Sequence, residues 1–80
     1  MTQQQLELEI ENRIEADYKK IVEIFGSKYN LMTRPYISGT VINVTEDMVK
    51  KYGREFNMNY DMMLKIVDPI AFRLQRQYFN

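Results

Sequence analysis

Carboxylates are the main candidates for acid–base chemistry in this sequence, because it contains no Cys and no His. Without thiolate or imidazole there is no Cys nucleophile, no Ser-His-Asp triad, no His-ligated metal and no zinc finger. Glu7, Glu11 and Glu15 recur at four-residue steps, and Asp61 precedes Asp68 by two helical turns. Paired carboxylates at such spacing can share a proton or bind a hard cation.

The same carboxylates also fit a non-catalytic role as solvent-exposed residues of a helix. A regular row of Glu on an amphipathic helix is normally its solvated face. The three glycines are widely separated, so no glycine-rich phosphate loop is present, and no acidic stretch has the alternating ligands of a calcium loop. The sequence therefore predicts a protein that is not an enzyme and that has no metal site and no cofactor.

A helix over residues 4–25 would place this row opposite an apolar stripe. Apolar side chains recur there at three- and four-residue steps, and they are Leu6, Ile10, Ile14, Tyr18, Ile21, Val22 and Phe25. Gly26 favours the end of the helix. Leu6, Leu8 and Ile10 also alternate with Glu residues, as in a strand, so a strand is the alternative for the first ten residues. The flanking Gln run and the later helical period favour the helix.

The next segment does not continue the helical pattern, because Arg34-Pro35 favours an extended residue before the proline ring. Residues 36–44 are rich in β-branched side chains, and we expect a short extended or β segment there. A lone strand is unstable, so it would need residues 29–33, a second subunit or a partner protein beside it.

The last part of the chain predicts helices. Thr45 favours the start of a helix over 46–56, and Asp61 suits the cap of the next one. Pro69 removes one backbone donor from that last helix, although the apolar phase is kept across it. The helix is therefore expected either to kink there or to restart as a fresh helix capped by Asp68 with Pro69 in its first turn. The predicted fold is mainly α, with a long N-terminal helix, a short extended/β segment near 36–44, and two to three C-terminal helices with a break or kink at Pro69.

One small domain is expected over 1–80, divided into a long helix (1–26), a loop and short strand (27–44), and C-terminal helices (45–80). The 11 basic and 11 acidic side chains leave no net charge, which disfavours bulk nucleic acid or an anionic membrane as partner. The apolar runs are too short to span a bilayer, and the start is acidic where a signal peptide is basic. The sequence predicts a cytoplasmic protein.

The composition also suggests an origin. Phe, Tyr, Met, Ile, Asn and Lys, which have AT-rich codons, make up 36 of the 80 residues. Such a bias is typical of many bacteriophages and low-GC bacteria. We therefore expect a phage-encoded protein that acts in the host cytoplasm.

Because the sequence disfavours catalysis, the expected function is binding to another protein, as a small regulator, adaptor or inhibitor. The partner is a host protein or a second copy, in a homo-oligomer or a hetero-complex. Methionines are flexible and polarizable, and aromatic and Arg residues are enriched at interfaces. The predicted partner-binding side chains combine an apolar group on the first helix with Met, Arg and aromatic groups near the C-terminus: Leu6, Leu8, Ile10, Met58, Met62, Arg73, Arg76, Tyr78 and Phe79.

The alternative function is a helix-turn-helix DNA-binding regulator. Residues 45–67 have the outline of two short helices joined by a turn. Lys50, Lys51 and Arg54 would then contact phosphates. The apolar character of 61–67 and the balanced net charge argue against this alternative.

Overall fold

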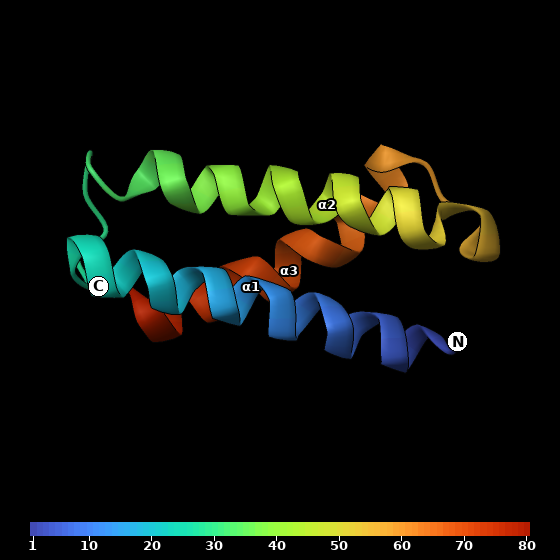
Figure 1. Cartoon of the computed structure of the whole chain (residues 1–80), viewed down its shortest axis with the longest axis horizontal. Helices are drawn as coiled ribbons and strands as arrows, with labels where there is room; N and C mark the ends of the chain where they lie inside the picture. The colour runs from blue at the N-terminus through green and yellow to red at the C-terminus, as the bar shows by residue number, and fades with distance from the viewer.

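The computed structural model describes residues 1–80 and contains three helices: α1 (Gln3–Phe25), α2 (Arg34–Phe56) and α3 (Tyr60–Tyr78). The prediction of a mainly helical chain is confirmed. Figure 1 shows that successive helices run in opposite directions and that α3 lies obliquely across the other two. The loop between α1 and α2 therefore lies at the same end as the C-terminus, and the turn between α2 and α3 lies at the end where the chain begins.

Helix α1 begins with a reciprocal cap. The Gln5 amide N–H donates to Oγ1 of Thr2 over 3.1 Å, and the Thr2 amide N–H donates to Oε1 of Gln5 over 2.8 Å. Gly26, at φ 88°, ends the helix in a conformation that favours glycine. The helix predicted over 4–25 is confirmed. The expectation that the N-terminal helix is the long helix of the fold is wrong, because α1 and α2 both have 23 residues.

The extended segment predicted near 36–44 is also wrong, since these residues lie within α2. Thr45 is likewise inside α2 and does not cap it. Burial outweighs the β propensity here, because Ile37, Val44 and Met48 share one helical face and all enter the core. The buried threonine hydroxyls remain satisfied: Thr45 donates to the carbonyl oxygen of Val41 over 2.7 Å. Pro35 lies in the first turn, where no backbone N–H is needed.

Helix α3 is continuous through Pro69, so the predicted break or kink is wrong and two helices, not three, follow the first loop. Pro69 removes one backbone donor. Val67 and Ala71 nevertheless keep their helical phase, because both are buried against the other helices. Asn59 caps α3 in place of Asp61, with its Oδ1 accepting from the Met62 amide N–H over 2.9 Å.

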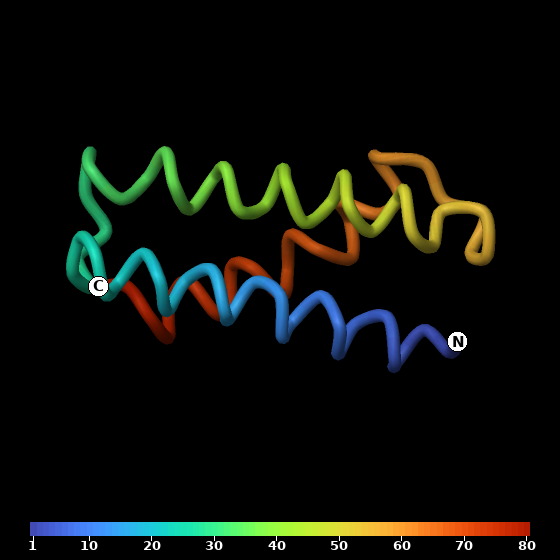
Figure 2. Tube along the Cα trace, in the orientation of Figure 1, coloured from blue at the N-terminus to red at the C-terminus, as the bar shows by residue number.

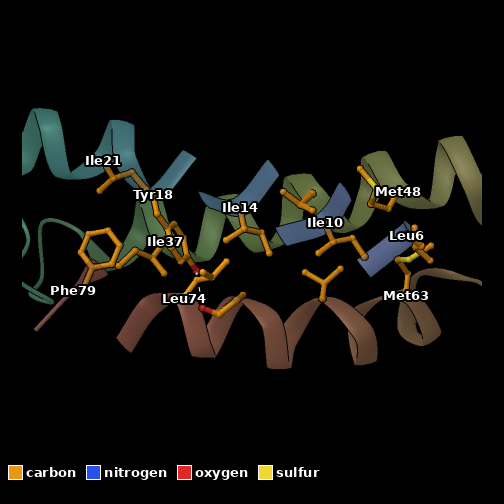
Figure 3. Close-up of a cluster of buried hydrophobic side chains, with 13 residues drawn as sticks. Leu6, Ile10, Ile14, Tyr18, Ile21, Ile37, Met48, Met63, Leu74 and Phe79 are labelled. Carbon is orange, nitrogen blue, oxygen red and sulfur yellow. Dashed lines mark hydrogen bonds between the residues drawn. The ribbon is translucent and has the colours of Figure 1, made fainter. Parts of the chain in front are cut away.

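The core consists of 13 buried apolar side chains contributed by all three helices and Phe79. Figure 3 shows Leu6 gathered with Met48 and Met63 at one end of this cluster, while Tyr18 and Phe79 lie at the other end. The Tyr18 and Phe79 rings meet edge to face, with centroids 5.3 Å apart. No helix has the combination of length and apolar character needed to cross a membrane.

The C-terminus is tied to the loop between α1 and α2. The Tyr29 amide N–H donates to the Asn80 carbonyl oxygen over 2.9 Å, and the Asn80 amide N–H donates to the Ser27 carbonyl oxygen over 2.8 Å. Figure 2 shows the end of the trace beside this loop. These bonds hold the loop against the end of the bundle.

Ion pairs between elements all involve the N-terminal part of the chain. Arg13 pairs with Asp47 of α2 at 2.7 Å, and Glu11 pairs with Arg73 of α3 at 3.0 Å. The terminal amine of Met1 pairs with Glu55 at 2.8 Å. No ion pair joins α2 to α3.

Candidate protein-binding surfaces

Large apolar side chains are exposed together at the end of the bundle that carries the first loop, at the left of Figure 1. We call this surface the apolar tip. Its side chains come from the end of α1, the loop and the start of α2, and they are Ile24, Tyr29, Leu31, Met32 and Tyr36. Leu31 is 85% exposed and Ile24 is 72% exposed. Exposed apolar groups clustered in this way mark interaction sites more often than isolated ones do.

The loop at the tip is held by its own hydrogen bonds. Oγ1 of the buried Thr33 donates to the Lys28 carbonyl oxygen over 2.6 Å and accepts from the Asn30 amide N–H over 3.0 Å. Oδ1 of Asn30 accepts from the amide N–H groups of Met32 (2.9 Å) and Thr33 (3.1 Å). This network orders the loop while Leu31 and Met32 remain in solvent.

Aromatic and basic groups surround these apolar side chains. The Tyr36 ring stacks on Phe25 with a centroid separation of 4.5 Å, and the Arg34 guanidinium lies 5.6 Å from the centroid of the Tyr29 ring. Lys20 and Lys28 are exposed at the same end. None of these three bases forms an ion pair within the protein. The tip therefore combines apolar contact groups with unpaired positive charge, although Asp17 and Glu23 lie on the same part of α1.

A second apolar surface is a groove of about 330 Å³ between α2 and α3. We call it the α2–α3 groove. Most of its lining is apolar or aromatic, contributed by Tyr29, Ile37, Val41, Ile42, Tyr60 and Leu64. Asp68 is its one charged lining residue.

A third, open depression of about 560 Å³ lies at the turn between α2 and α3. It brings together Met58 and Met62, two of the predicted partner-binding residues, and Arg54 also lines it. The turn is closed by a hydrogen bond from the Met58 amide N–H to the Gly53 carbonyl oxygen over 2.8 Å, with Asn57 in the left-handed conformation.

The other predicted partner-binding residues are dispersed. Leu6 and Ile10 are fully buried, so the expectation that they face solvent is wrong. Phe79 is also in the core. The reason is that α2 and α3 together cover the apolar stripe of α1, whereas Leu8 lies on the opposite face and is exposed.

The three remaining predicted residues of α3 each have a partner within the protein. Arg73 pairs with Glu11, and the Arg76 guanidinium lies 6.0 Å from the centroid of the Phe72 ring. Partial burial, followed by a hydrogen bond to Glu15, raises the pKa of the Tyr78 phenol above its ordinary value. These residues do not form one continuous surface with Met58 and Met62.

The bases of the DNA-binding alternative, Lys50, Lys51 and Arg54, lie on the second half of α2, and all three are exposed. The carboxylate of Asp47 lies on the same part of α2 and reduces the positive potential there. A hydrogen bond from Arg13, and then the charges of Arg13 and the two lysines, lower the pKa of Asp47. Asp47 therefore remains negative beside these bases.

The sequence patterns did not predict the apolar tip, because residues 29–33 were assigned only as a possible strand partner. One signal was present. Leu31 and Met32 are adjacent apolar residues outside any helical phase and between loop-forming residues. Two large apolar side chains at such a position do not belong to the buried face of either flanking helix.

Among the carboxylates, no group of three or more lies close enough together to hold a metal ion. Glu11, the central member of the predicted row, is engaged by Arg73. Comparison with protein-family models, with curated proteins and with solved structures finds no match.

Proposed function

We propose that this protein is a non-catalytic binder of another protein and that it contacts its partner through the apolar tip. The observation that carries the proposal is that a hydrogen-bonded loop holds Leu31 and Met32 in solvent. An ordered loop has already lost its conformational entropy on folding, so little more is lost when a partner binds it. Such preorganisation favours a stoichiometric regulator, adaptor or inhibitor.

The chemistry of the tip indicates the chemistry of the partner. Full burial of a Leu or Met side chain contributes roughly 1.5–3 kcal/mol, so Leu31 and Met32 would be the main anchors. Lys20, Lys28 and Arg34 would favour carboxylates around the pocket that receives these anchors. The proposed partner surface is therefore an apolar pocket with an acidic rim, on a host protein if the chain is phage-encoded.

The test compares two variants with similar chemistry at opposite ends of the bundle. Leu31→Ser combined with Met32→Ser removes the anchors, whereas Leu8→Ser removes an exposed apolar side chain of α1 far from the tip. Proteins captured from a bacterial lysate by the wild type would be identified by mass spectrometry, and the purified candidate titrated calorimetrically against all three chains.

We expect the tip variant to lose at least about tenfold in affinity, because burying two anchors contributes more than 1.4 kcal/mol. The Leu8→Ser control should bind as the wild type does. All three chains should show the same circular dichroism spectrum, since each altered side chain is exposed. A purified partner that binds the tip variant as tightly as the wild type would refute the proposal. The proposal would also be refuted if the tip variant captured every protein that the wild type captures.

A further inference from the structure

One exposed ridge of α3 carries an acid, an aromatic ring and a base in order. Phe72 is 59% exposed, with Asp68 four residues before it and Arg76 four residues after it. Residues at four-residue steps form one ridge along a helix. Neither Asp68 nor Arg76 forms an ion pair within the protein, and the Arg76 guanidinium lies over the Phe72 ring. Both charges on the ridge are therefore available to a partner.

This order is complementary to itself when two copies lie antiparallel. With a two-fold axis through Phe72, the Phe72 rings of the two copies meet at the centre. Asp68 of each copy then faces Arg76 of the other, so the same ion pair forms twice. In a parallel arrangement like charges would face each other instead.

We propose that a second copy of this chain binds here and that the protein forms an isologous dimer through the Asp68–Phe72–Arg76 ridge of α3. Packing of the i±4 ridges of two helices is a common class of helix contact. The test of this proposal is separate from that of the apolar tip, because the ridge residues lie on α3 and are not tip residues, although Tyr29 belongs both to the tip and to the α2–α3 groove.

The surface beside the ridge suits an interface larger than three side chains. A stable interface buries about 800 Å² on each partner, more than one ridge supplies. The α2–α3 groove adjoins the ridge through Asp68, and its other lining side chains are mostly apolar, with the exposed Ile42 on the α2 side. Because Asp68 is the one charged residue that lines the groove, a second copy that covers the groove must provide a partner for that carboxylate. The dimer provides Arg76 for it.

Charge exchange tests the geometry directly. Asp68→Lys places a lysine opposite Arg76, and Arg76→Asp places a carboxylate opposite Asp68, so each variant alone should dimerise at least about tenfold more weakly than the wild type. An equimolar mixture restores both pairs and should form heterodimers. Sedimentation velocity over a concentration series at low salt measures each state. Lys19→Asp, an exposed charge reversal on α1, is the matched control and should dimerise as the wild type does.

Phe72→Ser provides a second variant without any change of charge. It should keep the helical circular dichroism spectrum and lose dimerisation, because an exposed ring adds nothing to the core. A wild type that stays monomeric throughout the series would overturn the proposal. It would equally be overturned if either single variant dimerised normally, or if the mixed variants remained monomeric while the wild type dimerised.

Discussion

The phenolic hydroxyl of Tyr52 donates a hydrogen bond of 2.8 Å to Oε1 of Glu9, and so joins α2 to α1. The other carboxylate oxygen of Glu9, Oε2, is buried and has no hydrogen-bond partner. The bond to Glu9, followed by burial, raises the pKa of Tyr52 above its ordinary value. Tyr52 is therefore the side chain that donates a hydrogen bond to the Glu9 carboxylate.

Replacing Tyr52 with Phe should lower the thermal midpoint of unfolding. The ring would still pack, but the Glu9 carboxylate would lose its donor while remaining partly buried. Glu9→Gln removes the charge and should lower the midpoint less. A double-mutant cycle by calorimetry isolates the coupling between the two side chains. Equal midpoints for the wild type and Tyr52→Phe would show that this bond contributes nothing to stability.

The stability of the protein should fall at alkaline pH because of Tyr18. Burial, followed by the neighbouring charges of Tyr29, Asp17 and Asp68, raises the pKa of Tyr18 to about 12, above the ordinary phenol value of 10.0. A phenol whose pKa is higher in the folded state contributes stability that is fully present below pH 10.0 and is lost as the pH rises towards 12.

Urea unfolding of the wild type and Tyr18→Phe across this range measures the effect. The phenylalanine variant should lose stability less steeply between pH 10 and 12, because it has no phenol to ionise. Absorbance of the phenolate reports the ionisation independently. Parallel curves for the two proteins would contradict the raised pKa.

The glycines of α2 should respond in opposite directions to alanine. A Cβ added to Gly53 would lie 3.0 Å from the Met58 carbonyl oxygen, in the turn that closes α2. This clash should destabilise the protein by about 1–3 kcal/mol. Gly39 has no atom within 4 Å of an added Cβ, so Gly39→Ala should stabilise the helix by about 0.5–1 kcal/mol.

Denaturant midpoints of the two glycine variants provide the comparison. Each serves as the control for the other, because the chemical change is identical and both residues lie in the same helix. A stabilising Gly53→Ala would mean that the turn relaxes without cost.

The bases of α2 should not bind DNA specifically. If Lys50, Lys51 and Arg54 each contacted a phosphate, the affinity for a duplex would fall with salt at a log–log slope of roughly −2.7. Glu46, Asp47 and Glu55 on the same helix would repel the backbone, so we expect weak, nonspecific retention. A gel-shift series between low and physiological salt decides the question. Specific retention at physiological salt, lost when all three bases become Ala, would favour the DNA-binding alternative over a protein partner.

Local sequence patterns predicted some elements of this fold for a clear reason. In α1, the apolar period and Gly26 indicate the same helix that the structure has, and only the alternation of Leu6, Leu8 and Ile10 with Glu also fitted a strand. The uniform phase of Tyr60 to Tyr78 likewise predicted helix, and Pro69 altered only its expected continuity. For residues 36–44 the signals conflicted, because β-branched side chains favour a strand while Ile37 and Val44 keep a helical period.

Burial in the core decided for helix at residues 36–44, and burial depends on how all three helices pack together. The stripe of α1 that looked free to bind a partner is covered by α2 and α3, so Leu6 and Ile10 belong to the core. The apolar tip and the ridge of α3 form only when the three helices are in place. The sequence by itself determined that the chain is mainly helical, with residues 36–44 misassigned, and which face of α1 is apolar, because these depend on neighbours within a few residues. The tertiary structure alone decided which apolar residues remain exposed, because exposure depends on how segments distant in sequence pack together.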